Sequence, residues 1–198
     1  MFIELTDHLR CPASHEEQYL VLMPDEMEGR SVLRGSLGCP VCHRSFPIEQ
    51  GIATFGRAPG ITPAPTRLDP DAQAALAGLG GPGGYLVLVG GAAWHADQIA
   101  GHLPGIALVL VNPPADTPPV MLGSLLVAPS LPLKTSSMRA AILGPGFGSD
   151  PAWVEEAARV VLPGNRVVGE GEAPDHADLE LAASADGCWV ATRVRTRV

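Results

Sequence analysis

Between residues 85 and 143 the chain repeats one pattern, a short unbroken apolar run that ends in Gly, Pro or Asn. A run without polar alternation predicts a strand buried on both faces, as in a parallel sheet covered by helices. The segments HADQIAGHL and DPAWVEEAARVVL, which lie among these runs, have helical periodicity. Strands that alternate with helices predict an α/β fold with a doubly wound, mostly parallel sheet. The four runs are GYLVLVGG, IALVLVN, SLLVAPS and MRAAILGPG.

The rest of the chain divides into three further parts. Residues 1–57 contain short strand-like segments and turns, and predict a small β-rich module. Residues 58–70 are rich in Pro and Gly and predict an extended linker, so that residues 71–198 form the sheet domain. The segment LELAASADGCWVATRVR predicts a C-terminal antiparallel hairpin that turns at Asp186-Gly187.

The net charge, the apolar runs and the cysteine content argue against some classes of function. The net charge of −8 over 198 residues argues against a nucleic-acid-binding surface, which requires a basic patch. No apolar stretch is long enough to insert into a membrane, and the first residues do not resemble a signal peptide. Four cysteines, two of them in one short motif, fit a reducing compartment, and we expect a cytoplasmic protein.

The motif Cys39-Pro-Val-Cys42 has the spacing of a zinc knuckle, which supplies two of the four ligands of a zinc site. A second knuckle would begin at Cys11, but its second position is a serine, a poor ligand because its hydroxyl resists deprotonation. A histidine could complete the set, either His15 or His43. The alternative is a module that has lost its metal and is held by packing, and the sequence leaves both possibilities open.

Residues 5–55 resemble a small zinc-ribbon family that includes the activator subunit of tRNA and protein methyltransferases. That family has two C-P-x-C motifs followed by a YPI-x-DGIP strand, and the corresponding segments here are LTDHLRCPASHEE and GSLGCPVCHRSFPIEQGIATF. The resemblance implies a zinc site that includes Cys11, Cys39 and Cys42, for which we take His15 as the candidate fourth ligand, and a function exerted by binding another protein.

The larger part resembles class I S-adenosylmethionine-dependent methyltransferases. The segment LPLKTSSMRAAILGPGFGSDPAWVEEAARVVLPGNRVVGEGE is similar to the family's LPF-x-D-x-SFD turn, fourth strand and EAARVLRPGG helix. The resemblance implies a Rossmann-like fold and a cofactor site at the ends of the first strands. The residues at those positions are Gly90, Gly91 and Asn112.

The chain departs from this family where the cofactor would bind. The family's acid at the end of the first strand is Leu88 here, and Ala92 and Trp94 replace two glycines, so the Trp94 side chain would crowd the cofactor. Asn112 replaces the acid that holds the ribose, and SLLVAPS offers no acid for the adenine. We therefore do not expect S-adenosylmethionine to bind or methyl transfer to be efficient.

Three hypotheses follow. The favoured one is a non-catalytic, methyltransferase-like protein that serves as a regulatory or structural partner of another protein. The alternative is an active S-adenosylmethionine-dependent methyltransferase with an atypical cofactor loop, and the third is a pocket for another ligand with Trp94 as its stacking wall. A run of acids after NRVVG is interpreted as a solvated loop, namely Glu170, Glu172, Asp175, Asp178 and Glu180.

Overall fold

The computed structural model describes residues 1–62, 64–117 and 120–194. The strands of the first half are β1 (Val21–Glu28), β2 (Ser31–Gly38), β3 (Ser45–Glu49), β4 (Ile52–Thr54), β5 (Tyr85–Val89) and β6 (Ala107–Val111). Those of the second half are β7 (Gly123–Val127), β8 (Met138–Leu143), β9 (Val161–Glu170), β10 (Leu179–Ala185) and β11 (Cys188–Arg193). The helices are α1 (Pro70–Ala77), α2 (Ala96–His102) and α3 (Pro151–Val160), with 3-10 helices η1 (Ile3–His8) and η2 (Gly90–His95).

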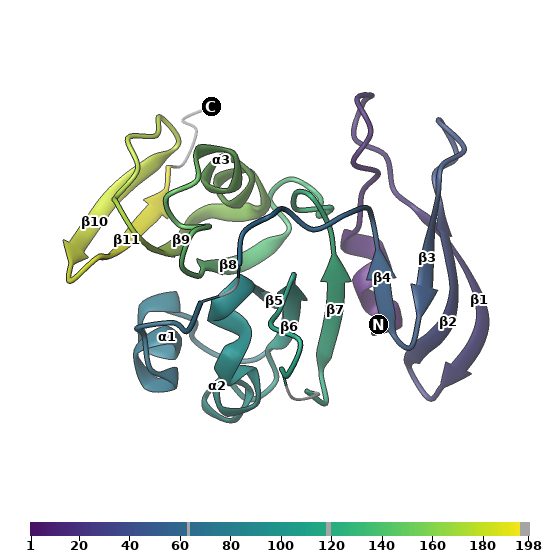
Figure 1. Ribbon diagram of the computed structural model, residues 1–198, viewed down its shortest axis with the longest axis horizontal. Helices are drawn as coiled ribbons and strands as arrows, with labels where there is room; N and C mark the ends of the chain where they lie inside the picture. Colours follow the sequence, from purple (N-terminus) through teal and green to yellow (C-terminus); the bar gives the residue numbers. More distant parts are fainter. Residues whose placement is uncertain (63, 118–119, 195–198) are drawn as a thin grey trace.

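The described strands form one sheet of 11 strands in the order β1-β2-β3-β4-β7-β6-β5-β8-β9-β11-β10 (Figure 1). The six strands from β4 to β9 in this order are parallel, and the outer strands pair antiparallel. The chain winds outward from β5 to β7 and then returns to place β8 and β9 on the other side of β5. The predicted Rossmann-like, doubly wound α/β sheet is confirmed, and its topological switch point lies between β5 and β8.

Alternate residues of the central strands enter two different cores. Leu86 and Leu88 of β5 lie in a core with the side chains of α1 and α2, whereas Val87 and Val89 lie in a core with those of α3. Figure 1 shows α1 and α2 together on one side of the sheet and α3 on the other. Because both faces of β5 are covered, its sequence is apolar at every position from Leu86 to Val89.

The helix boundaries follow from local capping. The carboxylate of Asp150 accepts hydrogen bonds from the N–H groups of Ala152 and Trp153, and Pro151 occupies the first turn of α3, where no donor is needed. The helix ends at Val160, earlier than its apolar pattern suggested. Val161 already belongs to β9, where it pairs with Met138 of β8.

The predicted β-rich N-terminal segment is confirmed as the antiparallel strands β1 to β4. Strand β4 then pairs parallel with β7, with Ile52 opposite Leu125 and Thr54 opposite Val127. The sheet is therefore continuous across both parts of the chain. The division at residues 57 and 70 into a module, a linker and a domain stays a prediction.

The C-terminal hairpin is also confirmed. Asp186 and Gly187 connect β10 to β11 with φ angles of 52° and 73°. Two consecutive positive φ angles define the turn type whose twist matches a two-residue hairpin, and Asp-Gly is a preferred sequence for it. Within the described ranges, no helix combines the length and apolar character that a membrane span requires.

Candidate functional site

Four metal-ligating side chains from two separate segments converge at the N-terminal end of the chain. Cys39 and Cys42 lie in the turn between β2 and β3, and Cys11 and His15 lie in the loop after η1. Their ligand atoms all lie within 4.8 Å of one another. The Sγ atoms of Cys11 and Cys42 are 3.6 Å apart, and the Cys39 Sγ lies 3.5 Å from Nε2 of His15.

Two of these distances, 3.6 Å between sulfurs and 3.5 Å between sulfur and nitrogen, fit a tetrahedral zinc ion. With Zn–S bonds of about 2.3 Å and a Zn–N bond of about 2.0–2.1 Å, two sulfurs would be about 3.7 Å apart and a sulfur and a nitrogen about 3.5 Å apart. Cys11 and Cys39 are buried, and Cys42 and His15 are partly buried, so the surrounding chain would shield the ion from water. Zinc in such a closed site would be structural, because all four positions are filled by protein.

The thiols differ in their electrostatic surroundings. Burial, together with the nearby thiols of Cys42 and Cys39, raises the pKa of the Cys11 thiol to about 11. Burial also acts to raise the pKa of Cys39, but the backbone N–H groups of Cys42 and Val41 outweigh it and the pKa is lowered. The backbone N–H of Arg44 is the main cause that lowers the pKa of Cys42. Two of the three sulfurs are therefore surrounded by N–H donors that stabilise a thiolate.

His15, and not His43, completes the cluster. Nδ1 of His15 lies 2.7 Å from the carbonyl oxygen of Glu16, which can only accept, so Nδ1 carries the proton and Nε2 offers its lone pair toward Cys39. His43 is exposed and lies outside the cluster, and Ser14 is also exposed. His15 thus supplies the ligand that Ser14, the residue before it, cannot supply.

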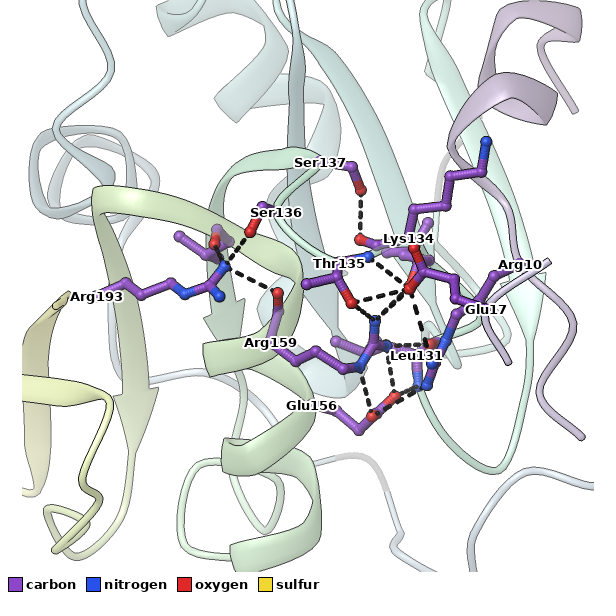
Figure 2. A network of polar contacts seen from close by, with 12 residues as sticks. Arg10, Glu17, Leu131, Lys134, Thr135, Ser136, Ser137, Glu156, Arg159 and Arg193 are labelled. Carbon is purple, nitrogen blue, oxygen red and sulfur yellow. Dashed lines mark hydrogen bonds and ion pairs between the residues drawn. The ribbon is translucent and has the colours of Figure 1, made fainter. Parts of the chain in front are cut away.

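A polar network ties the loop of the cluster to helix α3 (Figure 2). Arg10 and Glu17, which flank the loop, each form an ion pair with a residue of α3: Arg10 with Glu156 at 3.4 Å and Glu17 with Arg159 at 3.8 Å. Arg159 also pairs with Glu156, and Glu17 accepts hydrogen bonds from the N–H and hydroxyl of Thr135. Partly buried ion pairs therefore hold the loop of the cluster against helix α3.

The second candidate site is the glycine turn at the carboxyl end of β5, and it is covered. Gly90 and Gly91 are buried in the 3-10 helix η2. A Cβ atom added at Gly90 would overlap the ring of Phe147, and one at Gly91 would overlap the carbonyl oxygen of Ala64. The space that glycine leaves for close approach is therefore taken by the chain itself.

Ala64 belongs to the segment between β4 and α1, which we call the strap (residues 58–62 and 64–69). The strap has no helix or strand in its described residues. Figure 1 shows it leaving β4, passing across the view of the central strands and reaching α1. The N–H of Gly144, at the end of β8, donates to the Val89 carbonyl of β5 at 3.0 Å, so the two strands stay paired up to the glycine turn.

Asn112, at the end of β6, is used by a different contact from the one that the resemblance implies. Its side-chain nitrogen donates to the carbonyl of Ala128 at 2.8 Å, and its side-chain oxygen accepts from the N–H of Ala128 at 2.9 Å. The amide is 8% exposed and connects the ends of β6 and β7. Asn112 stands in place of a ribose-binding acid, and the oxygen and nitrogen of its amide are both already hydrogen-bonded.

Glu170 corrects the interpretation of the acidic run as solvated. It is only 3% exposed, and its carboxylate accepts hydrogen bonds from the Thr66 hydroxyl and the Arg67 N–H at 2.8 Å. Glu170 thereby fastens the strap to the end of β9. Neither this role nor that of Phe147 was predicted from the sequence. The one sequence feature that could have indicated the burial of Glu170 is its position at the end of a buried strand. The acids that follow it are exposed.

The comparisons with known proteins found similar solved structures. No protein-family model and no curated protein matches the chain. A solved geranyl diphosphate methyltransferase, in complex with GPP and sinefungin, is 19% identical over 50% of this chain, with a TM-score of 0.40. The chain spans only 43% of the length of that enzyme.

Two further solved structures are matched over a larger share of their length. The antibiotic-resistance methyltransferase Kmr is 14% identical, with 68% of this chain and 97% of that chain covered and a TM-score of 0.45. An S-adenosyl-L-methionine methyltransferase from Silicibacter pomeroyi DSS-3 is 15% identical, with 63% and 88% covered and a TM-score of 0.41. The fold assignment itself rests on the strand order described above.

Proposed function

We propose that this chain is a non-catalytic, methyltransferase-like protein that acts by binding another protein, and that its Cys₃His cluster holds a structural zinc ion. One observation carries the non-catalytic part: Gly90 and Gly91 are covered by Phe147 and by the carbonyl of Ala64. A cofactor at the end of β5 would have to displace both. The paired amide of Asn112 supports the same conclusion, because its oxygen and nitrogen are both engaged with the backbone of Ala128 and it carries no charge to strengthen a bond from a ribose hydroxyl.

The zinc part is supported by the donor set and its spacing. Three thiols and an imidazole lie at distances that suit tetrahedral coordination, and the imidazole is already oriented by its backbone hydrogen bond. A bound zinc ion would connect the loop after η1 to the β2–β3 turn. Thiol ligands stay reduced in the cytoplasm, which is the compartment that we propose.

A surface on β1 supports the protein-binding part. Tyr19, Val21, Met23, Met27 and Val41 are all more than 40% exposed, and we call them the β1 patch. Val21, Met23 and Met27 lie on β1, Tyr19 just precedes it and Val41 is in the β2–β3 turn, and exposed apolar side chains grouped together are typical of protein-binding surfaces. Strand β1 is also at the edge of the sheet.

Isothermal titration with S-adenosylmethionine and S-adenosylhomocysteine tests the non-catalytic part. We expect no saturable heat at ligand concentrations up to about 1 mM, at which a weak complex would still be detected. Micromolar binding of either ligand would overturn the proposal. It would favour the alternative, an active methyltransferase with an atypical cofactor loop.

A comparison of interaction partners tests the binding part. The wild-type protein and a Val21→Lys/Met23→Lys variant are used as baits, with Leu181→Lys on the opposite edge strand as the control. We expect a protein that is captured by the wild type and by Leu181→Lys to be lost with the double variant. Equal capture by all three would contradict a role for the β1 patch.

A further inference from the structure

A pocket of about 290 Å³ opens beside the covered glycine turn, between the strap and the carboxyl ends of β6 and β7. The strap forms one wall through Ile61, β7 forms another through Leu125 and Val127, and Phe147 contributes an aromatic ring. Trp94, which the sequence suggested as a stacking wall, is not among the lining residues. Phe147, the aromatic residue of the lining, is only 1% exposed, so the walls of the pocket are mainly aliphatic.

The lining is nearly free of polar groups. Of the twelve lining side chains, only those of Asn112 and Thr117 are polar, and none is charged. The Asn112 amide is already paired with the backbone of Ala128. A phosphate, carboxylate or ammonium group placed here would lose its hydration without gaining a partner of opposite charge, which is strongly unfavourable.

Nearby backbone does not offer an anion site either. The helix that follows β5 begins as the 3-10 helix η2, and α2 has only 7 residues. The backbone nitrogens of Gly91 and Ala92 lie so close to Gly144 that a Cβ atom added there would come within 2.9 Å and 2.6 Å of them, which leaves no room for a phosphate between them. The chemistry of the pocket thus excludes the charged parts of a nucleotide.

We propose that this pocket binds a small, uncharged, apolar molecule of about the size of a two-ring aromatic. The size follows from volume: an apolar protein cavity of about 150 Å³ holds one benzene ring, so 290 Å³ suits about two. This function goes beyond partner binding, and it uses the cleft that a methyltransferase cofactor would otherwise occupy.

Fluorescence titration with 1-naphthylamine, an uncharged two-ring aromatic probe, tests the proposal. We expect saturable binding of one probe per wild-type chain, with a dissociation constant on the order of 10 µM for a ligand of this size. Two filling variants enter the pocket from opposite walls, Val127→Phe on β7 and Ala58→Phe on the strap. Each is expected to weaken binding by about tenfold or more, because the added ring takes the volume of the ligand.

The control is Leu181→Phe, which adds an aromatic ring on an exposed position of β10 and is expected to bind the probe like the wild type. Circular dichroism and thermal unfolding show whether each variant is folded, and either filling variant alone suffices for the test. Non-saturable binding, or equal binding by both filled variants and the wild type, would overturn the proposal. Displacement of the probe by S-adenosylmethionine would also overturn it, since the pocket would then be a cofactor site.

Discussion

At the scale of single residues, the candidate zinc cluster depends on side chains that are already held in place. The backbone N–H groups around Cys39 and Cys42 stabilise their thiolates, and the Glu16 carbonyl fixes the imidazole of His15. Cys11 is the exception, because burial raises the pKa of its thiol to about 11. A cation is the group that would stabilise the Cys11 thiolate, so the ion and this residue depend on each other.

Replacing one thiol tests the cluster. For Cys39→Ser we expect bound zinc to fall from about one ion per chain to less than about 0.2, because a serine hydroxyl does not replace a thiolate. The midpoint of thermal unfolding should fall by on the order of 5–10 °C. Metal analysis of the purified protein and a thermal melt check these values.

Cys188→Ser is the matched control, because Cys188 is the one cysteine that lies outside the cluster. It should keep the full zinc content. A wild-type protein that contains no zinc after purification, and takes up none when zinc is added, would contradict the zinc proposal.

At the scale of elements, the strap is the segment whose position decides the function. Its described contacts include the buried carboxylate of Glu170, which accepts from the Thr66 hydroxyl and the Arg67 N–H, and the buried amide of Gln73, which donates to the Leu68 carbonyl at 3.0 Å. Its next anchor is the Asp69 carboxylate, which accepts from the N–H of Ala72 at the start of α1. Between these contacts and β4, the strap covers Gly91.

Removing the Glu170 carboxylate should loosen the strap. In Glu170→Ala the Arg67 N–H loses its partner, which costs about 1–3 kcal/mol and raises the population of the open strap at least about fivefold. Arg67 is exposed, so trypsin cleavage after it should accelerate by a similar factor. Mass spectrometry of a digestion time course measures this rate.

The neighbouring variant Glu172→Ala removes an exposed carboxylate and should leave the cleavage rate unchanged. Equal rates for Glu170→Ala and the wild type would mean that the strap is held by other contacts. The closed cofactor turn would then not depend on Glu170.

Local sequence was sufficient to predict the elements but not the contacts that cover the turn. The strands β5 and β6 were predictable because their burial on both faces leaves only apolar residues, and the hairpin because Asp186-Gly187 suits its turn. Glu170 was misread because its partners lie 103 and 104 residues earlier in the chain. Phe147 lies in the glycine-rich segment GPGFGSD, which has no periodicity that could predict which surface its ring covers.

The metal cluster was predictable only in part. The spacing of Cys39 and Cys42 identified half of it, but the choice between His15 and His43 depends on how the loop after η1 meets the β2–β3 turn. The polar network that fixes this loop joins Arg10 and Glu17 to residues more than a hundred positions later. Such long-range pairing leaves no pattern in a single sequence.

At the scale of the whole molecule, the two parts of the chain share one sheet and one of its two cores. Leu37 and Ile48 of the N-terminal strands lie in the same buried cluster as Val109 and Leu126. The pairing of β4 with β7 and the ion pairs of Arg10 and Arg159 connect the parts further. We expect them to unfold together.

Coincident unfolding can be measured because each part carries its own probe. Trp94, Trp153 and Trp189 all lie in the larger part, and cobalt placed in the Cys₃His cluster reports on the N-terminal part through its absorbance. In urea the two signals and the circular dichroism should give midpoints that agree within about 0.2 M. Loss of the cobalt signal at a clearly lower midpoint would mean that residues 1–57 unfold as an independent module.

The pairing of β4 with β7 also decides which margins of the sheet face the solvent. Unpaired, β7 would present a row of free N–H and carbonyl groups, the kind of margin on which other chains add strands and aggregate. The actual margins are β1, with register shifts around Pro24 and Glu26, and β10, with one between Leu181 and Ala183. Irregular margins of this kind are poor templates for a further strand. The N-terminal strands thus keep the edge of β7 from pairing with other chains. A protease cut that released them would expose this edge and leave the remainder prone to precipitate.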